Sequence, residues 1–290
     1  MYLFSLYSYA ELLGSYLFTL IADKDLLVAL NAEASKHNST PGIILMLDVG
    51  DLREGVDNID ELVELAVLCE KLPNLNLCGV GTNHACLNGV LPTYENLSFL
   101  VEGAEAIARA IGRRLDIISG GSTINLLLMK DGKNEMPKRI NHLRLGGCIA
   151  NPINMRLGRG LQFKGMREDT VKILAEIIEI HEKASAPKAV STKNWAGQTV
   201  TQIDKGRRMR AILAIGSQDI ADVTAMIPLD EGVEIIGCSS DHTIVDVTEC
   251  RLNLKSGDTL SFKIRYANML CAFSGNHVSI LFAHDSDKNL

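Results

Sequence analysis

Short apolar runs alternate with amphipathic helical patterns along the first half of the chain. Apolar runs typical of strands fall at 16–21, 43–48, 75–80, 115–119 and 141–146. Helical patterns separate them at 23–36, 58–72, 94–111 and 123–129. This alternation is the pattern of βαβ units, in which parallel strands form a sheet that helices cover. The sequence therefore predicts five parallel strands in the first half of the chain.

The second half of the chain has a different pattern, with β-rich segments separated by turn residues. These segments fall at 210–215, 233–238, 243–247, 259–266 and 277–282. The segment 171–180 fits either a helix or a buried strand, and we interpret it as a strand that enters a second domain. The change of pattern predicts a separate β domain. We place the two domains at residues 1–155 and 156–290.

Five parallel strands are fewer than the eight that close a barrel. Either the sheet is open or strands are missing, so the sequence by itself predicts an α/β domain with a parallel sheet, followed by a β domain. Residues 1–21 are rich in Leu, Tyr and Phe, but Glu11 and Gly14 interrupt them and no basic leader precedes them. We expect neither a signal peptide nor a membrane span there, and we interpret the stretch as core that lacks its cover.

Charge and cysteine content restrict the partners of the chain. Its 29 basic and 35 acidic residues give a net charge of -6. The basic residues cluster only at 205–210, so nucleic acid is not an expected partner. Seven cysteines without a Cys-x-x-Cys pair fit reduced thiols in the cytoplasm. Cys78, His84 and Cys86 lack a fourth ligand at suitable spacing, so no metal site is expected.

Polar turns follow four of the apolar runs in the first half of the chain. They lie at 48–55 (DVGDLREG), 81–83 (GTN), 119–123 (SGGST) and 144–147 (RLGG). The carboxyl ends of parallel strands meet at one edge of a sheet, where loops carry the chemistry. The turns are therefore expected to line one ligand site. Two glycines at 120–121 would let the backbone approach a phosphate, although a Gly-Gly pair before a serine is also a common helix start.

The order and spacing of these turns, together with the stretch 230–242, resemble the alanine racemase family of pyridoxal-phosphate enzymes (fold type III), most closely its ornithine racemase-like branch. The resemblance implies a barrel that carries pyridoxal 5'-phosphate and a C-terminal β domain that closes the active site of the partner in a homodimer. The fold that the resemblance implies is α/β: a partial (β/α)8 TIM-type barrel, with about five of its eight units, followed by a C-terminal β domain. The five strands would be the fourth to the eighth. The first three βα units, with the Schiff-base lysine, would be absent, and we expect a truncated chain rather than a natural remnant.

The resemblance assigns three side chains to the cofactor's ring. Arg53 would contact the ring hydroxyl, oriented by Asp48 and Asp51, and Asn83 would pack against the ring. Arg144 would face the pyridine nitrogen and keep it unprotonated, which suits racemisation. Each has a structural alternative: an exposed arginine paired with its neighbour Glu54, a turn asparagine, and a barrel-rim arginine in an ion pair.

The resemblance also assigns a phosphate site and a substrate side. Ser122 and Thr123 would bind the phosphate, and Gly146 and Gly147 would complete its cup. The alternative for the serine and threonine is an ordinary helix start.

In the second domain the resemblance makes Ser240 and Asp241 substrate-side candidates, with Asp241 and His242 as candidate catalytic groups. Their alternative is a β-turn whose side chains cap local backbone groups. Segment 216–220 (GSQDI) stands where alanine racemases carry a catalytic tyrosine, and Ser217 cannot replace that base unaided.

These features predict a pyridoxal-phosphate-dependent racemase of ornithine, alanine or another small or basic amino acid, cytoplasmic and homodimeric, without a nucleic-acid or membrane partner. Without the Schiff-base lysine the chain by itself is expected to be inactive. One alternative is a non-catalytic remnant that binds pyridoxal phosphate or a partner subunit. Another is a fold type III amino-acid decarboxylase, against which Arg144 counts because those enzymes place a carboxylate at the pyridine nitrogen.

Overall fold

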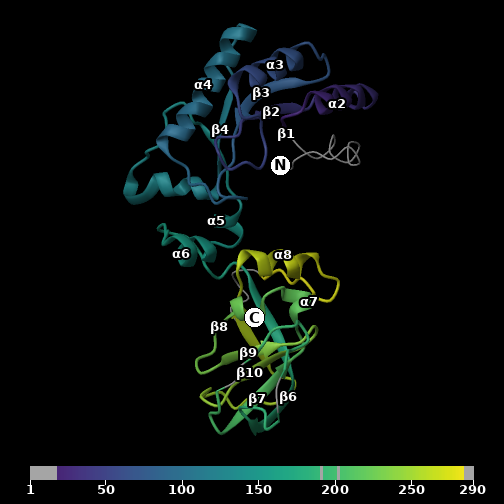
Figure 1. Cartoon of the computed structure of the whole chain (residues 1–290), viewed down its shortest axis with the longest axis vertical. Coiled ribbons are helices and arrows are strands. Elements are labelled where there is room, and N and C mark those ends of the chain that lie inside the picture. Colours follow the sequence, from purple (N-terminus) through teal and green to yellow (C-terminus); the bar gives the residue numbers. More distant parts are fainter. Residues whose placement is uncertain (1–17, 190–191, 201–202, 284–290) are drawn as a thin grey trace. The chain divides into compact units, whose positions relative to one another are not determined.

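The structure is a computed structural model that describes residues 18–189, 192–200 and 203–283. The chain divides between Gly146 and Gly147 into two compact units. Figure 1 shows the first unit in purple to teal and the second in teal to yellow. The domain ranges 1–155 and 156–290 stay a prediction. The interpretation of residues 1–17 as uncovered core lies outside the described residues.

A five-stranded parallel sheet forms the first unit. Its strand order follows the sequence: β1 (Phe18–Ile21), β2 (Gly42–Met46), β3 (Asn76–Gly81), β4 (Ile117–Ser122) and β5 (His142–Arg144). Three helices connect the strands: α2 (Lys24–Lys36), α3 (Ile59–Glu70) and α4 (Tyr94–Ile111). The 3-10 segment η1 (Thr123–Gly132) lies between β4 and β5 and replaces the short helix predicted at 123–129. The predicted partial barrel of five parallel strands is confirmed.

Local signals define the helices of this unit. The side chains of Asp23, Asn58 and Thr93 each accept a backbone N–H at the start of a helix, and Gly112 ends α4 in the left-handed conformation. The side chains of β2 are buried along its whole length, as expected for a strand that helices and neighbouring strands cover. The apolar faces of α2, α3 and α4 pack against this sheet in one core.

The second unit contains a six-stranded sheet of antiparallel pairs in the order β8-β11-β6-β7-β10-β9. Its strands are β6 (Lys172–Ala184), β7 (Arg207–Leu213), β8 (Ile227–Pro228), β9 (Glu234–Cys238), β10 (Thr243–Asp246) and β11 (Thr259–Lys263). The long strand β6 pairs with β11 through its first residues and with β7 through its remaining ones. The strand predicted at 171–180 and the separate β domain are both confirmed.

The C-terminal part of the described chain differs from the prediction. Segment 277–282 contains no strand, and its residues Ile280, Leu281 and Phe282 are exposed. The strand predicted at 259–266 is shorter than expected. It ends at Lys263, and helix α8 (Tyr266–Ser274) begins three residues later. An apolar run forms a strand only where a neighbouring strand satisfies its backbone, and β11 already lies between β6 and β8.

Short helices of the second unit were not predicted. They are α5 (Gly147–Ala150), α6 (Ile153–Arg159), α7 (Ser217–Ile220) and the 3-10 turn η2 (Val223–Ala225). Elements of this length carry too few residues to show a hydrophobic period in the sequence.

Candidate functional site

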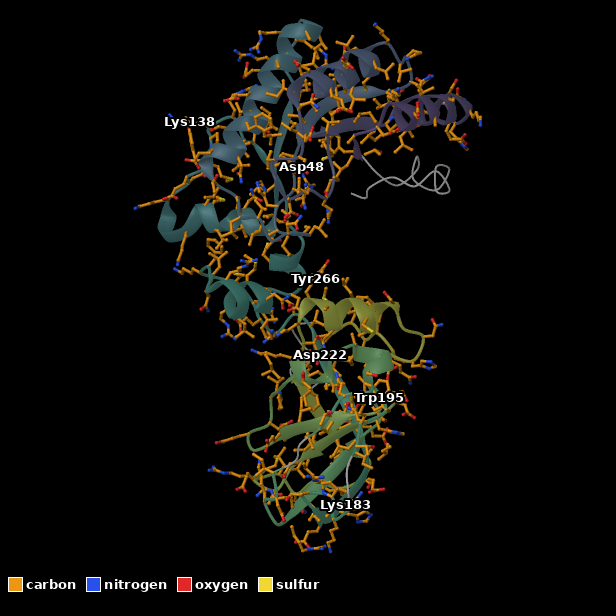
Figure 2. All side chains as sticks on the ribbon, viewed as in Figure 1. Asp48, Lys138, Lys183, Trp195, Asp222 and Tyr266 are labelled. Atoms are coloured by element: carbon orange, nitrogen blue, oxygen red, sulfur yellow. The ribbon has the colours of Figure 1, made fainter. Side chains whose placement is uncertain are left out.

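Strand register brings the predicted turns of the first unit to one edge of the sheet. Met46 is opposite Gly81, Gly81 is opposite Ser119, and Ser122 is opposite Arg144. The turns that follow β2, β3, β4 and β5 therefore lie next to one another at the carboxyl ends of the strands. In Figure 2 the label Asp48 marks the turn after β2, where the carboxylate accepts the N–H of Gly50 at 2.7 Å.

Arg144 at the end of β5 links three of these strand ends. Its Nη1 donates to Ser119 Oγ at 2.6 Å, and its Nη2 donates to the carbonyl of Thr82 at 2.5 Å. Burial lowers the pKa of the guanidinium from its ordinary value. No carboxylate among the described residues forms an ion pair with it, so the rim ion pair considered as the alternative is not formed in the described part of the chain. Gly81 lies beside this guanidinium, since an added Cβ would lie 3.4 Å from Nη1 and 3.2 Å from both Ile44 Cγ2 and Ser119 Cβ.

Three consecutive residues after β3 carry buried polar atoms without a hydrogen-bond partner. They are Oγ1 of Thr82, Nδ2 of Asn83 and Nδ1 of His84. A buried polar atom that makes no hydrogen bond costs about 1–3 kcal/mol, so such a group indicates a missing partner. Thr82 and Asn83 therefore offer polar atoms to a polar ligand, whereas Nδ1 of His84 lies beside Gly121.

The turn at 119–123 is held in a conformation that only glycine permits. Gly121 has a φ of +129°, and a Cβ there would lie 2.4 Å from Asn125 Oδ1. Asn125 is fully buried, donates to the carbonyl of Gly120 at 2.6 Å and accepts the N–H of Ser122 at 3.1 Å. This asparagine was not predicted from the sequence, although an amide residue three positions after an N-cap serine is the capping-box signal.

Thr123 connects this turn with the end of β5. Its Oγ1 accepts the N–H of Gly146 at 3.4 Å, while Gly147 begins helix α5. The open space around Gly146, where an added Cβ would meet nothing within 4 Å, fits the predicted phosphate cup. Because Asn125 already occupies the N–H of Ser122, the phosphate would be bound by the hydroxyls and the remaining amides.

Arg53 differs from its expected surroundings. The side chain is 40% exposed and forms a bidentate ion pair with Glu54, the arrangement given as the structural alternative. The expectation that Asp51 orients it was wrong, because that carboxylate is buried and bonded elsewhere. The role of Arg53 at the ring hydroxyl stays a prediction.

Asp51 organises the loop after β3 instead. Its carboxylate accepts backbone N–H groups at 2.9–3.2 Å from Cys86, Leu87, Asn88 and Val90. Burial alone would raise the pKa of this carboxyl, but these N–H donors lower it, and the net result is a pKa below the ordinary value. The buried aspartate thus connects the turn after β2 with the loop that follows His84.

In the second unit, the loop at 216–218 lies against the turn at 239–242. Ser217 N–H donates to the carbonyl of Ser239 at 3.2 Å, and Gln218 N–H donates to that of Ser240 at 2.9 Å. Gly216 permits this approach, since a Cβ there would lie 2.3 Å from the carbonyl oxygen of Ser240. The two second-domain segments predicted to belong to the site are therefore adjacent. Trp195, labelled in Figure 2, donates to the carbonyl of Cys238 just before the turn at 2.8 Å.

Asp241 and His242 form an exposed polar group on this turn. Asp241 Oδ1 accepts the hydroxyls of Ser240 at 3.0 Å and Ser239 at 3.1 Å, and it lies 3.4 Å from His242 Nδ1. These two hydrogen bonds hold the pKa of the Asp241 carboxyl below its ordinary value, and the bond from Ser240 has the larger effect. The side chains of this turn therefore bond to one another, as in the β-turn given as the structural alternative, and the imidazole of His242 remains accessible to solvent.

Metal-binding clusters and membrane-spanning helices are both absent from the described part of the chain. Among those residues, no group of three or more His, Cys, Asp or Glu side chains is arranged to hold a metal ion. No helix among the described residues has the length and apolar character needed to cross a membrane.

Comparison with known proteins identifies relatives of both units. The family model described as "Alanine racemase, N-terminal domain" matches residues 2–150. The chain is 36% identical over 261 residues to the ornithine racemase of Acetoanaerobium sticklandii, covering 89% of this chain and 71% of that protein. It is 34% identical over 265 residues to the lysine racemase of Thermotoga maritima, covering 91% of this chain and 72% of that protein.

Solved structures share the fold at low sequence identity. An alanine racemase from Clostridium difficile 630 matches with a TM-score of 0.59 and 14% identity, over 91% of this chain and 66% of that one. A D-threo-3-hydroxyaspartate dehydratase from Delftia sp. HT23 matches with a TM-score of 0.59 and 17% identity, over 93% of this chain and 71% of that one. The chain thus spans about two thirds to seven tenths of the length of these relatives. The similarity confirms the predicted fold class of a partial barrel followed by a C-terminal β domain.

Proposed function

The chain belongs to the alanine racemase family, and we propose that it carries the function of a pyridoxal-phosphate-dependent amino-acid racemase. Pyridoxal 5'-phosphate is the cofactor by resemblance to the ornithine, lysine and alanine racemases. The observation that carries the proposal is Arg144, a guanidinium at the end of β5 that is held by Ser119 and Thr82 and pairs with no carboxylate in the described part of the chain.

The proposed substrate is a basic amino acid. The two curated relatives are named for ornithine and lysine, and each is more than twice as similar to this chain as the alanine racemase structure is. Ornithine and lysine are therefore the first substrates to test, ahead of alanine.

The residues of the first unit would bind the cofactor and set its protonation. Pyridoxal phosphate, when bound, withdraws electrons from the substrate's α-carbon and so makes the α-proton removable. Arg144 can only donate hydrogen bonds, so at a pyridine nitrogen it would leave that nitrogen without a proton. Ser122, Thr123, Gly146 and Gly147 would hold the phosphate, and Asn83 would lie against the ring.

The residues of the second unit would act on the substrate side. Ser240 and Asp241 are the proposed substrate contacts, and His242 is the proposed group that holds or moves a proton on one face of the α-carbon. Asp241, with its lowered pKa, would remain ionised beside the imidazole. We further propose a homodimer in the cytoplasm, in which this turn serves the partner's site.

The activity of the chain by itself is a separate proposal. No lysine lies at the carboxyl end of a strand in the described part of the first unit. We propose that the chain alone binds the cofactor without a covalent bond and does not turn over. A non-catalytic protein that binds pyridoxal phosphate or a partner subunit is therefore the second candidate. A fold type III decarboxylase is disfavoured by Arg144, because a guanidinium cannot protonate the pyridine nitrogen as a carboxyl group can.

A combined binding and turnover experiment tests these proposals. The purified chain is mixed with pyridoxal phosphate, passed through gel filtration, and its near-ultraviolet and visible absorbance is recorded before and after borohydride reduction. Retained cofactor without a reduced lysine adduct is the expected result. A reduced adduct identified on a lysine by mass spectrometry would contradict the proposal of non-covalent binding. Chiral chromatography of ornithine, lysine and alanine then measures racemisation directly.

A further inference from the structure

His84 is a buried histidine to which the proposed function assigns no role. It follows β3, its side chain is 1% exposed, and its Nε2 lies 3.2 Å from Oδ1 of Asn96 in the first turn of α4. A buried imidazole nitrogen without a hydrogen-bond partner costs free energy of folding, and of the two ring nitrogens only Nε2 has a partner.

The surroundings of Asn96 fix which nitrogen carries the proton. The Nδ2 of Asn96 donates to the carbonyl of Leu91 at 3.0 Å, and its Oδ1 accepts the N–H of Thr93 at 2.9 Å. Rotating the amide would place two donors against each other at Thr93 and two acceptors against each other at Leu91. Oδ1 therefore faces the ring as an acceptor, and Nε2 of His84 must be the donor. In the neutral ring Nδ1 then has no hydrogen.

This Nδ1 atom, which carries no hydrogen, lies next to Gly121 in the turn at 120–123. It has no hydrogen-bond partner, and a Cβ added to Gly121 would lie 3.1 Å from it. The same added Cβ would lie 2.4 Å from Asn125 Oδ1, the atom that accepts the N–H of Ser122. The imidazole and the asparagine amide thus both lie beside the position that a Cβ of residue 121 would take.

We propose that neutral His84, with its proton on Nε2, is a positioning residue that holds the turn at 120–123 in the conformation that presents Ser122 and Thr123. This inference rests on the proposed function in one respect, namely that the turn binds the cofactor's phosphate. Asn96 acts through the ring, because its Oδ1 keeps the proton of His84 on Nε2. The Nδ1 atom next to Gly121 therefore carries no hydrogen that would clash with the turn.

Protonation of the ring would disturb this arrangement. It adds a hydrogen and a positive charge at Nδ1 next to Gly121, and the turn would have to move to accommodate them. The uncharged groups that face the ring come from α4 and η1. The charged groups that act on it are Asp51 and Asp48 from the turn after β2, which raise its pKa, and Arg144 from β5, which lowers it. Burial is the largest effect and brings the pKa below its ordinary value of 6.5.

Nuclear magnetic resonance of the whole chain tests the inference without any ligand. The nitrogen shifts of His84 report its tautomer, and the amide resonances of residues 120–123 report the turn while the pH is lowered from about 7.5 to about 5. We expect the Nε2-protonated tautomer and turn amides that shift together with the titration of His84. A neutral ring with its proton on Nδ1 would overturn the inference.

Three variants separate a positioning role from mere packing. In His84→Gln the amide still donates to Asn96 but cannot titrate, so the turn amides should no longer follow pH. The exposed His37→Gln is the matched control and should behave like the wild type. Asn96→Asp places a negative charge at Nε2 and should move the transition to higher pH. Turn amides that titrate in His84→Gln as they do in the wild type would contradict the inference, because His142 near Ser119 would then be the group responsible.

Pyridoxal phosphate binding connects the turn to the proposed function. As the pH falls from 7.5, the wild type should lose more affinity than His84→Gln, and the difference should grow toward about tenfold as the ring becomes protonated. The titration of the phosphate itself, near pH 6, is common to both proteins and cancels in the comparison. A wild-type affinity that rises at low pH relative to His84→Gln would mean that the imidazolium attracts the anion, which contradicts positioning. If neither protein binds the probe, the phosphate site of the proposed function fails, while the resonance experiment still decides the role of His84.

Discussion

The site residues of the first unit and those of the second are held in place by different interactions. Around Arg144, side chains are buried, several polar atoms lack partners, and a single aspartate, Asp51, fixes a whole loop. Around Asp241, the side chains are exposed and bond to one another, and backbone hydrogen bonds fix the turn. The first region therefore leaves buried polar atoms without partners, whereas the second satisfies its polar groups locally at the surface.

The largest effect is expected in the second unit, from Gly216→Ala. The new Cβ would lie 2.3 Å from the carbonyl oxygen of Ser240, a backbone atom that cannot move aside alone. We expect about 3 kcal/mol of lost stability in chemical denaturation. Gly237→Ala in β9 is the control, because an added Cβ there meets nothing within 4 Å. Equal stability of the two variants would show that backbone contact does not fix the turn.

The next effect is expected in the first unit, from Asp51→Asn. An amide offers only one acceptor oxygen to the four N–H groups, so we expect a loss of about 2 kcal/mol at neutral pH. The folded pKa of Asp51 is lower than the unfolded value of 3.8, so its contribution is complete above that pH and disappears as the pH falls through the folded pKa. Denaturation curves of both proteins should therefore converge in acid, with exposed Asp60→Asn as the control. Curves that stay parallel down to about pH 3 would contradict this role.

A smaller effect on stability is expected from Arg144→Lys, with a clear effect on binding. A lysine has one charged nitrogen and cannot serve both Ser119 Oγ and the carbonyl of Thr82, so about 1 kcal/mol of stability should be lost. Retained pyridoxal phosphate should also absorb at a different wavelength, because an ammonium group is a different neighbour for the ring. Lys133→Arg on the surface is the control. Unchanged absorbance would place the guanidinium away from the ring.

The smallest effect on stability is expected from Asp241→Asn. This exposed side chain contributes through local hydroxyl bonds that an amide can replace, so the midpoint of thermal unfolding should not change. Racemisation by a complete enzyme that contains this turn should fall, because the proposed substrate contact loses its negative charge. Unchanged racemisation would remove Asp241 from the substrate side.

Local sequence signals predicted much of the first unit. Helix α4 has both of its predicted ends, because Thr93 caps its start and Gly112 ends it. The site was predicted less completely. Nothing next to Asp51 in the sequence shows that its carboxylate meets the backbone of residues 86–90, because that contact depends on how two loops fold together. Arg53 does not pair with Asp51 as expected. Here a local contact decides, since the side chain pairs with its neighbour in the sequence, Glu54.

The second unit shows where such signals end. The sequence predicted β6 correctly although its apolar pattern also fitted a helix, because alternate residues of its first half face the core. It did not predict α8, because no glycine, proline or side-chain cap marks the start of this helix at Tyr266. Periodicity alone cannot locate such a boundary.

Strand β6 also has a consequence for the order of folding. In the first unit every strand pairs with the strand before or after it in the sequence, so its contacts can form as the chain leaves the ribosome. In the second unit β6 must wait for β11, which is the last strand of the sheet to be synthesised. Pairing over such a sequence separation is slow. We therefore expect the first sheet to be complete while one edge of β6 is still unpaired, and that edge is where a folding chain of this protein is most exposed to aggregation.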